Sequence, residues 1–134
     1  AVVTNQSGLA RGFLTSEQFG AVQSRVDELL SEAGAGYDAL AYCPHGPSDG
    51  CPCRKPRQGM LKLLARHLSW SSADCALVGD KASDLQLASD AGMKPILVRT
   101  GYGEQTKLTP IPEDTVLVDD IAAAVSWLLQ RSDG

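Results

Sequence analysis

The sequence predicts an α/β fold in which a three-layer arrangement places helices on both faces of a parallel sheet. Two observations lead to this class. Short apolar runs with the composition of buried strands alternate with helical segments along the chain. Polar residues follow several of these runs, at the strand ends where such folds carry reactive groups. The 134 residues, 43% apolar and 21% charged, are typical of one domain, which we take to span 1–134.

The first half begins with the end of a strand over 1–4 and a glycine-bearing loop over 5–14. Thr15 and Gln18 have the spacing of a capping box, which predicts a helix from there to about residue 33. The apolar side chains that fall on one face of this helix are Phe19, Val22, Val26, Leu29 and Leu30.

The next predicted strand covers 37–42, and a loop rich in cysteine, proline and glycine follows over 43–56. Helical periodicity then extends over 58–68. The second half repeats the alternation with a strand at 75–78, a helix at 83–91, strands at 95–98 and 115–118, and a helix at 121–129.

Charge is unevenly distributed in this acidic chain of net charge −4. The segment Arg54–Arg66 holds five of the 12 basic residues and no acid, which favours a small anionic ligand over a nucleic acid. No apolar run approaches the roughly 20 residues needed to span a bilayer, and the first residues do not resemble a signal peptide. We therefore expect a cytoplasmic monomer that binds a small molecule, and neither nucleic acid nor a membrane.

Four potential metal ligands lie within eleven residues, in the pattern Cys43-x-His45-x5-Cys51-x-Cys53. Three thiolates and one imidazole are a common tetrahedral zinc set, and four protein ligands indicate a structural site. The alternative is a disulfide or unrelated free thiols, which would leave His45 without a role. Cys75 lies in an apolar strand and is predicted to be an inert core thiol.

A second group of candidates follows the strand at 75–78. Asp80 comes just after that strand and Asp84 four residues later, a spacing that directs carboxylates toward a magnesium ion. The alternative is purely structural, with Asp80 in a turn and Asp84 as a charge at a helix N-terminus.

Two further segments are suited to phosphate. Thr4 and the backbone N–H groups up to Gly8 follow a strand and can bind a phosphoryl oxygen, although a simple polar turn is the alternative. Arg54 and Lys55 lie directly after the cysteine cluster, where they either hold phosphate charge or form a solvated basic turn.

Taken in order, the segments VVTNQSGLARG, CPHGPSDGCPCRKP, LVGDKASDLQLASDAG and LVRTGYG resemble the haloacid dehalogenase (HAD) superfamily of phosphatases. Within it they are most similar to the D-glycero-D-manno-heptose 1,7-bisphosphate phosphatase branch, which includes histidinol-phosphate phosphatases. The resemblance implies a Rossmann-like, HAD-like fold without a large cap domain. It implies hydrolysis of a sugar phosphate, the 7-phosphate of the heptose, with histidinol phosphate as the alternative substrate. A non-catalytic, zinc-stabilised module that binds phosphate is the alternative of another class.

The resemblance also implies roles for individual residues. Thr4 would hydrogen-bond the transferring phosphoryl group, Lys55 would neutralise its charge, and Asp80 would hold Mg²⁺. Residues implied in substrate contact are Asn5, Gln6, Arg54, Lys55 and Lys81. The implied zinc ligands are Cys43, His45, Cys51 and Cys53.

The chain departs from the family pattern at its start. The resemblance implies a strand ending in Asp-x-Asp, whose first aspartate is the nucleophile and whose second is the general acid and base. No such pair precedes Val2, and the adjacent acids Asp119 and Asp120 come after the last predicted strand. By the family's topology the absent strand would be central, between the strands at 1–4 and 75–78. Three alternatives account for the absent strand: the strands at 1–4 and 75–78 pair with each other, another chain supplies the strand, or the sequence is a fragment. We expect these 134 residues alone not to hydrolyse phosphate esters.

Overall fold

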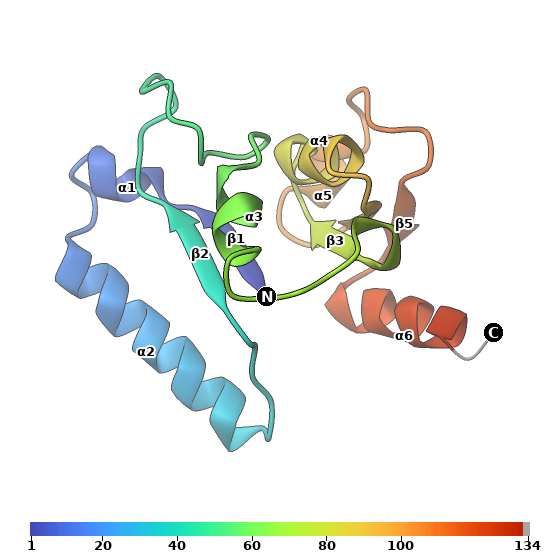
Figure 1. Cartoon of the computed structure of the whole chain (residues 1–134), viewed down its shortest axis with the longest axis horizontal. Helices are drawn as coiled ribbons and strands as arrows, with labels where there is room; N and C mark the ends of the chain where they lie inside the picture. The colour runs from blue at the N-terminus through green and yellow to red at the C-terminus, as the bar shows by residue number, and fades with distance from the viewer. Residues whose placement is uncertain (133–134) are drawn as a thin grey trace. The chain divides into compact units, whose positions relative to one another are not determined.

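The computed structural model describes residues 1–132, which form two compact units that meet between Leu68 and Ser69 in the sequence. Each unit consists of parallel strands and helices (Figure 1). The predicted α/β class is confirmed, whereas the assignment of 1–134 to a single domain stays a prediction. Within the described residues, no helix is long and apolar enough to cross a membrane.

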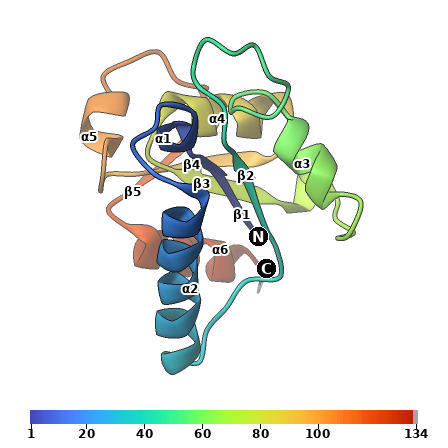
Figure 2. The same ribbon diagram turned by 90° about the vertical axis from the view of Figure 1, so that its left-hand side faces the viewer.

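The first unit contains a two-stranded parallel sheet. Strand β1 (Val2–Asn5) pairs in register with β2 (Leu40–Cys43), and the two run side by side in both views (Figures 1 and 2). Strand β2 therefore begins three residues after the predicted start at residue 37. The loop predicted over 5–14 contains a short helix, α1 (Ser7–Ala10), which follows β1 directly.

The long helix α2 (Ser16–Glu32) begins as predicted. Thr15 Oγ1 accepts from the Gln18 backbone N–H at 3.1 Å, and the Gln18 side chain accepts from the Thr15 N–H at 2.9 Å, which completes the capping box. Gly34 ends the helix with a φ of 70°, a conformation that glycine adopts without steric cost. On its apolar face Phe19 is buried and contacts the Tyr42 ring at 4.7 Å between centroids.

Helix α3 (Gly59–Leu64) is shorter than the helical periodicity over 58–68 predicts. It packs on β2 through the buried side chains of Met60 and Leu64. Gly59 is required at its start, because a Cβ there would overlap the Pro52 backbone carbonyl, whose oxygen accepts from the Gly59 N–H at 3.0 Å. The cysteine loop is thereby held against the first turn of α3.

The second unit contains a three-stranded parallel sheet in the order β3 (Ala76–Gly79), β4 (Lys94–Val98), β5 (Val116–Val118). The central strand β4 is the most buried of the three, as expected for a strand covered on both faces. Strand β3 is at one edge of this sheet, as β1 is in the two-stranded sheet.

Helices cover both faces of the three-stranded sheet. Helix α4 (Ala82–Asp90) packs on β3 and β4, and α6 (Ile121–Ser132) packs on β4 and β5 from the opposite side (Figure 1). On the α6 side, Ile96 and Val98 form a buried cluster with Ala124. In the second unit two short helical segments were not predicted: α5 (Gly103–Thr106) and a 3₁₀ turn at Ser72–Asp74.

Candidate functional site

Four side chains converge at the end of β2 and in the loop that follows it. The sulfur atoms of Cys43, Cys51 and Cys53 and the Nδ1 atom of His45 all lie within 4.8 Å of one another. Cys43 Sγ is 3.2 Å from Cys53 Sγ and 3.6 Å from Cys51 Sγ. His45 Nδ1 is 3.1 Å from Cys53 Sγ and 3.5 Å from Cys43 Sγ. The four residues predicted as zinc ligands are thus brought together, and the three cysteines among them are free thiols.

These separations suit one tetrahedral ion. Zinc–sulfur bonds of about 2.3 Å at a tetrahedral angle place two sulfur atoms about 3.8 Å apart, and a sulfur and a nitrogen slightly closer. The observed contacts of 3.1 to 3.6 Å are close to these values. The donor set and its geometry therefore fit a closed four-ligand metal site.

The electrostatics of the cluster differ between its thiols. Burial, together with a hydrogen bond to Cys53, raises the pKa of Cys43 to about 12. Burial would also raise the pKa of Cys51, but the backbone N–H of Arg54 and the neighbouring thiols outweigh it and lower that pKa to about 6. Backbone N–H groups directed at a sulfur stabilise the thiolate, the form that binds metal.

The loop around the cluster is shaped by its own contacts. The Asp49 carboxylate accepts from the Gly46 backbone N–H at 2.7 Å, and Arg57 Nη1 donates to the Cys51 carbonyl at 2.5 Å. Gly50 has a φ of 66° between them. These bonds fix the turn that brings Cys51 and Cys53 back toward the end of β2.

Thr4 and Lys55 lie at the end of β1 in the same unit. Lys55 Nζ donates to the Val3 carbonyl at 2.9 Å, which holds the lysine side chain along β1. The Asn5 side chain accepts from the Lys55 backbone N–H at 3.0 Å and donates to the Lys55 carbonyl at 3.4 Å. Gln6 Nε2 donates to Thr4 Oγ1 at 2.9 Å. Each of the two residues predicted to bind phosphate is thus hydrogen-bonded to residues of the segment 3–6, Thr4 to Gln6 and Lys55 to Val3 and Asn5.

Arg54, next to Lys55, carries a buried donor. Its Nη1 atom is inaccessible to solvent and has no hydrogen-bond partner among residues 1–132. Buried donors are nearly always paired, and an unpaired guanidinium N–H is costly. An acceptor such as an anion, a water or a carbonyl would satisfy this donor, and the role of Arg54 in binding phosphate stays a prediction.

In the second unit, Asp80 follows β3 as predicted. Its Oδ2 accepts from the Tyr102 backbone N–H at 2.9 Å, and its carbonyl accepts from Thr106 Oγ1 at 2.7 Å. Gly101 has a φ of 62°, and a Cβ there would overlap the Asp80 carboxylate. The loop before α5 is thus closely fitted to Asp80, and carboxylate oxygen is a suitable ligand for Mg²⁺.

Asp84 has a structural role within this unit. It is 5% exposed, and its Oδ2 accepts from the Lys81 backbone N–H at 3.0 Å at the start of α4. Gly79 is required beside it, because a Cβ at Gly79 would overlap the Asp84 carboxylate. This carboxylate therefore anchors the turn between β3 and α4, as the structural alternative for Asp84 predicts.

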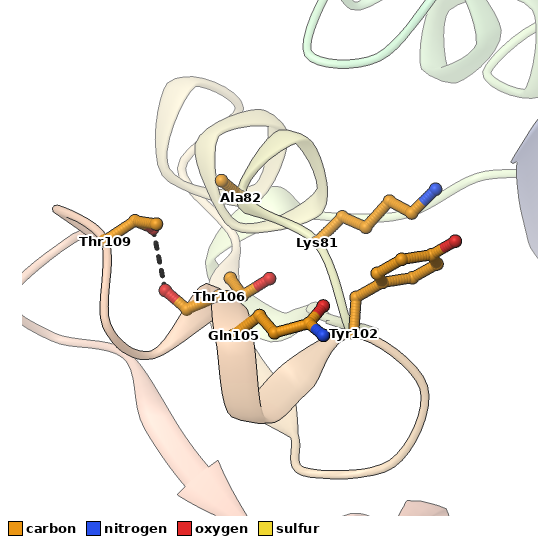
Figure 3. Close-up of a pocket in the computed structure, with 6 residues that line it drawn as sticks. All are labelled: Lys81, Ala82, Tyr102, Gln105, Thr106 and Thr109. Carbon is orange, nitrogen blue, oxygen red and sulfur yellow. Dashed lines mark hydrogen bonds between the residues drawn. The ribbon is translucent and has the colours of Figure 1, made fainter.

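A shallow pocket of about 260 Å³ lies between the start of α4 and α5 (Figure 3). Lys81 Nζ lies 4.5 Å from the centroid of the Tyr102 ring, and both side chains border the pocket. The remaining lining residues are Ala82, Gln105, Thr106 and Thr109. Sequence reasoning named Lys81 but missed Tyr102, whose only signal was its place in the segment LVRTGYG.

The adjacent acids after β5 have partners of their own. Asp119 Oδ1 lies 3.1 Å from Arg99 Nε, and Asp120 Oδ1 accepts from the Ala123 N–H at 2.8 Å at the start of α6. Arg99 also pairs with Glu104 at 3.1 Å. Hydrogen bonds from Lys107 and then Arg99 hold the pKa of Glu104 below its usual value.

Comparison with known families agrees with the site. Residues 52–124 match the model of the HAD-hydrolase-like family, which covers more than half of the chain. The chain therefore belongs to the HAD-hydrolase-like family and, with the relatives described below, is a phosphoric monoester hydrolase, so the resemblance read from the sequence is confirmed.

The relatives define the branch. Over 130 residues the chain is 45% identical to the D-glycero-beta-D-manno-heptose-1,7-bisphosphate 7-phosphatase of Pseudomonas aeruginosa, covering 97% of this chain and 73% of the relative. It is 42% identical to the enzyme of that name from Bordetella bronchiseptica, covering 98% and 74%. Within the family, the chain is a member of the branch that these 7-phosphatases form.

Solved structures agree with this placement. The crystal structure of D,D-heptose 1,7-bisphosphate phosphatase from B. bronchiseptica, complexed with magnesium and phosphate, has a TM-score of 0.91 at 43% identity. The match covers 97% of this chain and 74% of that one. The enzyme of the same name from Burkholderia thailandensis has a TM-score of 0.73 at 28% identity, covering 99% and 75%.

Proposed function

We propose that this protein hydrolyses a sugar phosphate, the 7-phosphate of D-glycero-D-manno-heptose 1,7-bisphosphate. The names of its relatives support this substrate. The observation that carries the proposal is the group of donors in the first unit: the Thr4 hydroxyl, the Lys55 ammonium and the unpaired, buried Nη1 of Arg54. Together they are suited to a phosphoryl group, which carries negative charge on several oxygens.

Phosphoryl transfer depends mainly on positioning and on stabilisation of charge. In this proposal, Thr4 donates to one phosphoryl oxygen and Lys55 neutralises the charge that develops on the group. Arg54 donates its buried N–H to the same substrate. Because Thr4 and Lys55 are already held by their own contacts, little reorganisation of these two residues is needed when the phosphoryl group binds.

Asp80 would hold Mg²⁺ in the second unit. Its Oδ2 is already held by the Tyr102 N–H, which orients the carboxylate, and an oxygen ligand of full charge is what this ion prefers. When bound, the ion would withdraw charge from the phosphoryl oxygens. The B. bronchiseptica relative was solved with magnesium and phosphate, which supports the same cofactor here.

Cys43, His45, Cys51 and Cys53 would hold zinc. Four protein ligands leave no open position, so the ion would be structural rather than catalytic. The ligand Cys53 directly precedes Arg54 and Lys55 in the sequence, so the metal site is adjacent to both cations. In this proposal zinc fixes the loop that presents both cations to the substrate.

The test is phosphate release by the protein expressed from its complete reading frame, because the 134 residues contain no Asp-x-Asp pair to supply the implied nucleophile. We expect kcat/KM with Mg²⁺ to be higher for the heptose bisphosphate than for histidinol phosphate, and to fall in Lys55→Met. A preference for histidinol phosphate would overturn the substrate assignment. Binding of phosphate without any release would favour a non-catalytic module.

A further inference from the structure

We propose that Asn5 and Gln6 are positioning residues: Asn5 holds Lys55 and Gln6 orients the hydroxyl of Thr4. The resemblance to the family implies direct substrate contact for both, whereas their contacts within the first unit indicate an indirect role. The inference rests on the proposed function, because it takes Thr4 and Lys55 as the groups that bind the phosphoryl.

The Asn5 amide contacts Lys55 at two points. Its Oδ1 accepts from the Lys55 backbone N–H at 3.0 Å, and its Nδ2 donates to the Lys55 carbonyl at 3.4 Å. A backbone N–H can only donate and a carbonyl can only accept, so this pairing fixes which end of the amide faces which group. With the bond from Lys55 Nζ to the Val3 carbonyl, three contacts tie Lys55 to β1, across 50 residues of sequence.

These contacts matter because lysine is a flexible cation. Its four-carbon stem has many rotamers, and its ammonium stabilises a transition state only when it is held in place. Lys55 lies two residues after Cys53 in the cysteine loop, so a movement of the loop backbone would displace the Lys55 ammonium. A displacement of about 1 Å at a reacting centre can cost on the order of 10²-fold in rate.

Gln6 acts on Thr4 by a related principle. Gln6 Nε2 donates to Thr4 Oγ1 at 2.9 Å, which occupies one lone pair of a hydroxyl that has a single proton to donate. The Thr4 O–H is then not used toward Gln6 Nε2 and is available to donate to another acceptor, which in the proposed function is a phosphoryl oxygen. The Gln6 backbone N–H donates to the Cys43 carbonyl at 2.8 Å, so the residue that orients Thr4 is itself anchored at the end of β2.

Double-mutant cycles separate the indirect role from direct substrate contact. In the protein from the complete reading frame, we expect Asn5→Ala to lower kcat about 10- to 100-fold with a smaller change in KM. In a Lys55→Met background, the same substitution should change kcat less than about threefold. Gln6→Ala should likewise lose its effect in a Thr4→Val background. Gln23→Ala is the matched control, because its amide bonds to Asp27 and Tyr37 instead of to Thr4, Asn5, Gln6 or Lys55.

Losses that multiply in the double variants would overturn the inference, because Asn5 and Gln6 would then act on the substrate independently of Lys55 and Thr4. Asn5→Asp is the second variant if Asn5→Ala does not fold, since it keeps the acceptor for the Lys55 N–H and replaces the donor to the Lys55 carbonyl with a charged oxygen. If the wild type releases no phosphate, the proposed function fails. The inference is then decided by the same cycles on the Kd for inorganic phosphate, where independent effects again overturn it.

Discussion

The ligand Cys51 offers the sharpest test of the cysteine cluster. In the first unit the buried apolar side chains of the described residues are Phe19, Ala41, Met60 and Leu64, together with the ligands Cys43 and Cys51. A core of this size supplies little hydrophobic stabilisation. We therefore expect the metal to contribute much of the stability of this unit, so that Cys51→Ser destabilises it.

The magnitude follows from the four-ligand geometry. Structural zinc sites bind with about 10 to 16 kcal/mol, which is roughly 3 kcal/mol for each of four ligands. For a domain of this size about 1 kcal/mol shifts the melting temperature by roughly 4 to 8 °C. Cys51→Ser should therefore lower Tm by more than about 10 °C, measured by differential scanning calorimetry.

The control for this prediction is Cys75→Ser, because Cys75 is a free thiol of the second unit outside the cluster. Metal analysis by mass spectrometry should find one zinc per wild-type and Cys75→Ser chain, and less in Cys51→Ser. Equal melting temperatures for the two variants, or no zinc in wild-type protein purified without chelator, would refute the reasoning.

Three further predictions concern the second unit. Asp80→Asn should lower kcat on the order of 10²-fold or more at saturating substrate, because a lost carboxylate weakens magnesium binding; unchanged turnover would exclude Asp80 as a ligand. Lys81→Ala should raise KM for the bisphosphate without changing Tm, since this side chain is exposed at the pocket edge; an unchanged KM would argue against substrate contact. Because the pKa of Glu104 is lowered in the folded state, its ion pairs stabilise the protein above the ordinary glutamate pKa and are lost as the pH falls through the lowered value. The difference in unfolding free energy between wild type and Glu104→Gln should therefore shrink as the pH falls below the ordinary glutamate pKa and vanish once the pH is below the lowered pKa; a difference that grows as the pH falls would reverse the sign of this argument.

Local patterns were predicted well from the sequence. The capping box of Thr15 and Gln18 depends on residues three positions apart, and the zinc ligands from Cys43 to Cys53 lie within eleven residues. The one-turn helices α1 and α5 were missed because four residues carry no helical periodicity. Apolar periodicity also continues beyond Leu64, where helix α3 ends.

Contacts between distant residues could not be predicted. The pairing of Asn5 with Lys55 spans 50 residues, and that of Asp80 with Tyr102 spans 22, so neither leaves a signal in the local sequence. Such contacts decide whether a polar residue faces a ligand or supports a neighbour. The sequence identified the chemical groups of the candidate site. The contacts that hold these groups in place could be found only from the folded structure.

The position of hydrolysis tests the central claim most directly. Phosphorus NMR distinguishes the two phosphates of D-glycero-D-manno-heptose 1,7-bisphosphate during incubation with Mg²⁺ and the protein from its complete reading frame. We predict that the resonance of the 7-phosphate disappears as inorganic phosphate forms, that the 1-phosphate persists, and that Lys55→Met slows the conversion. Loss of the 1-phosphate first, or no inorganic phosphate at all, would contradict the account.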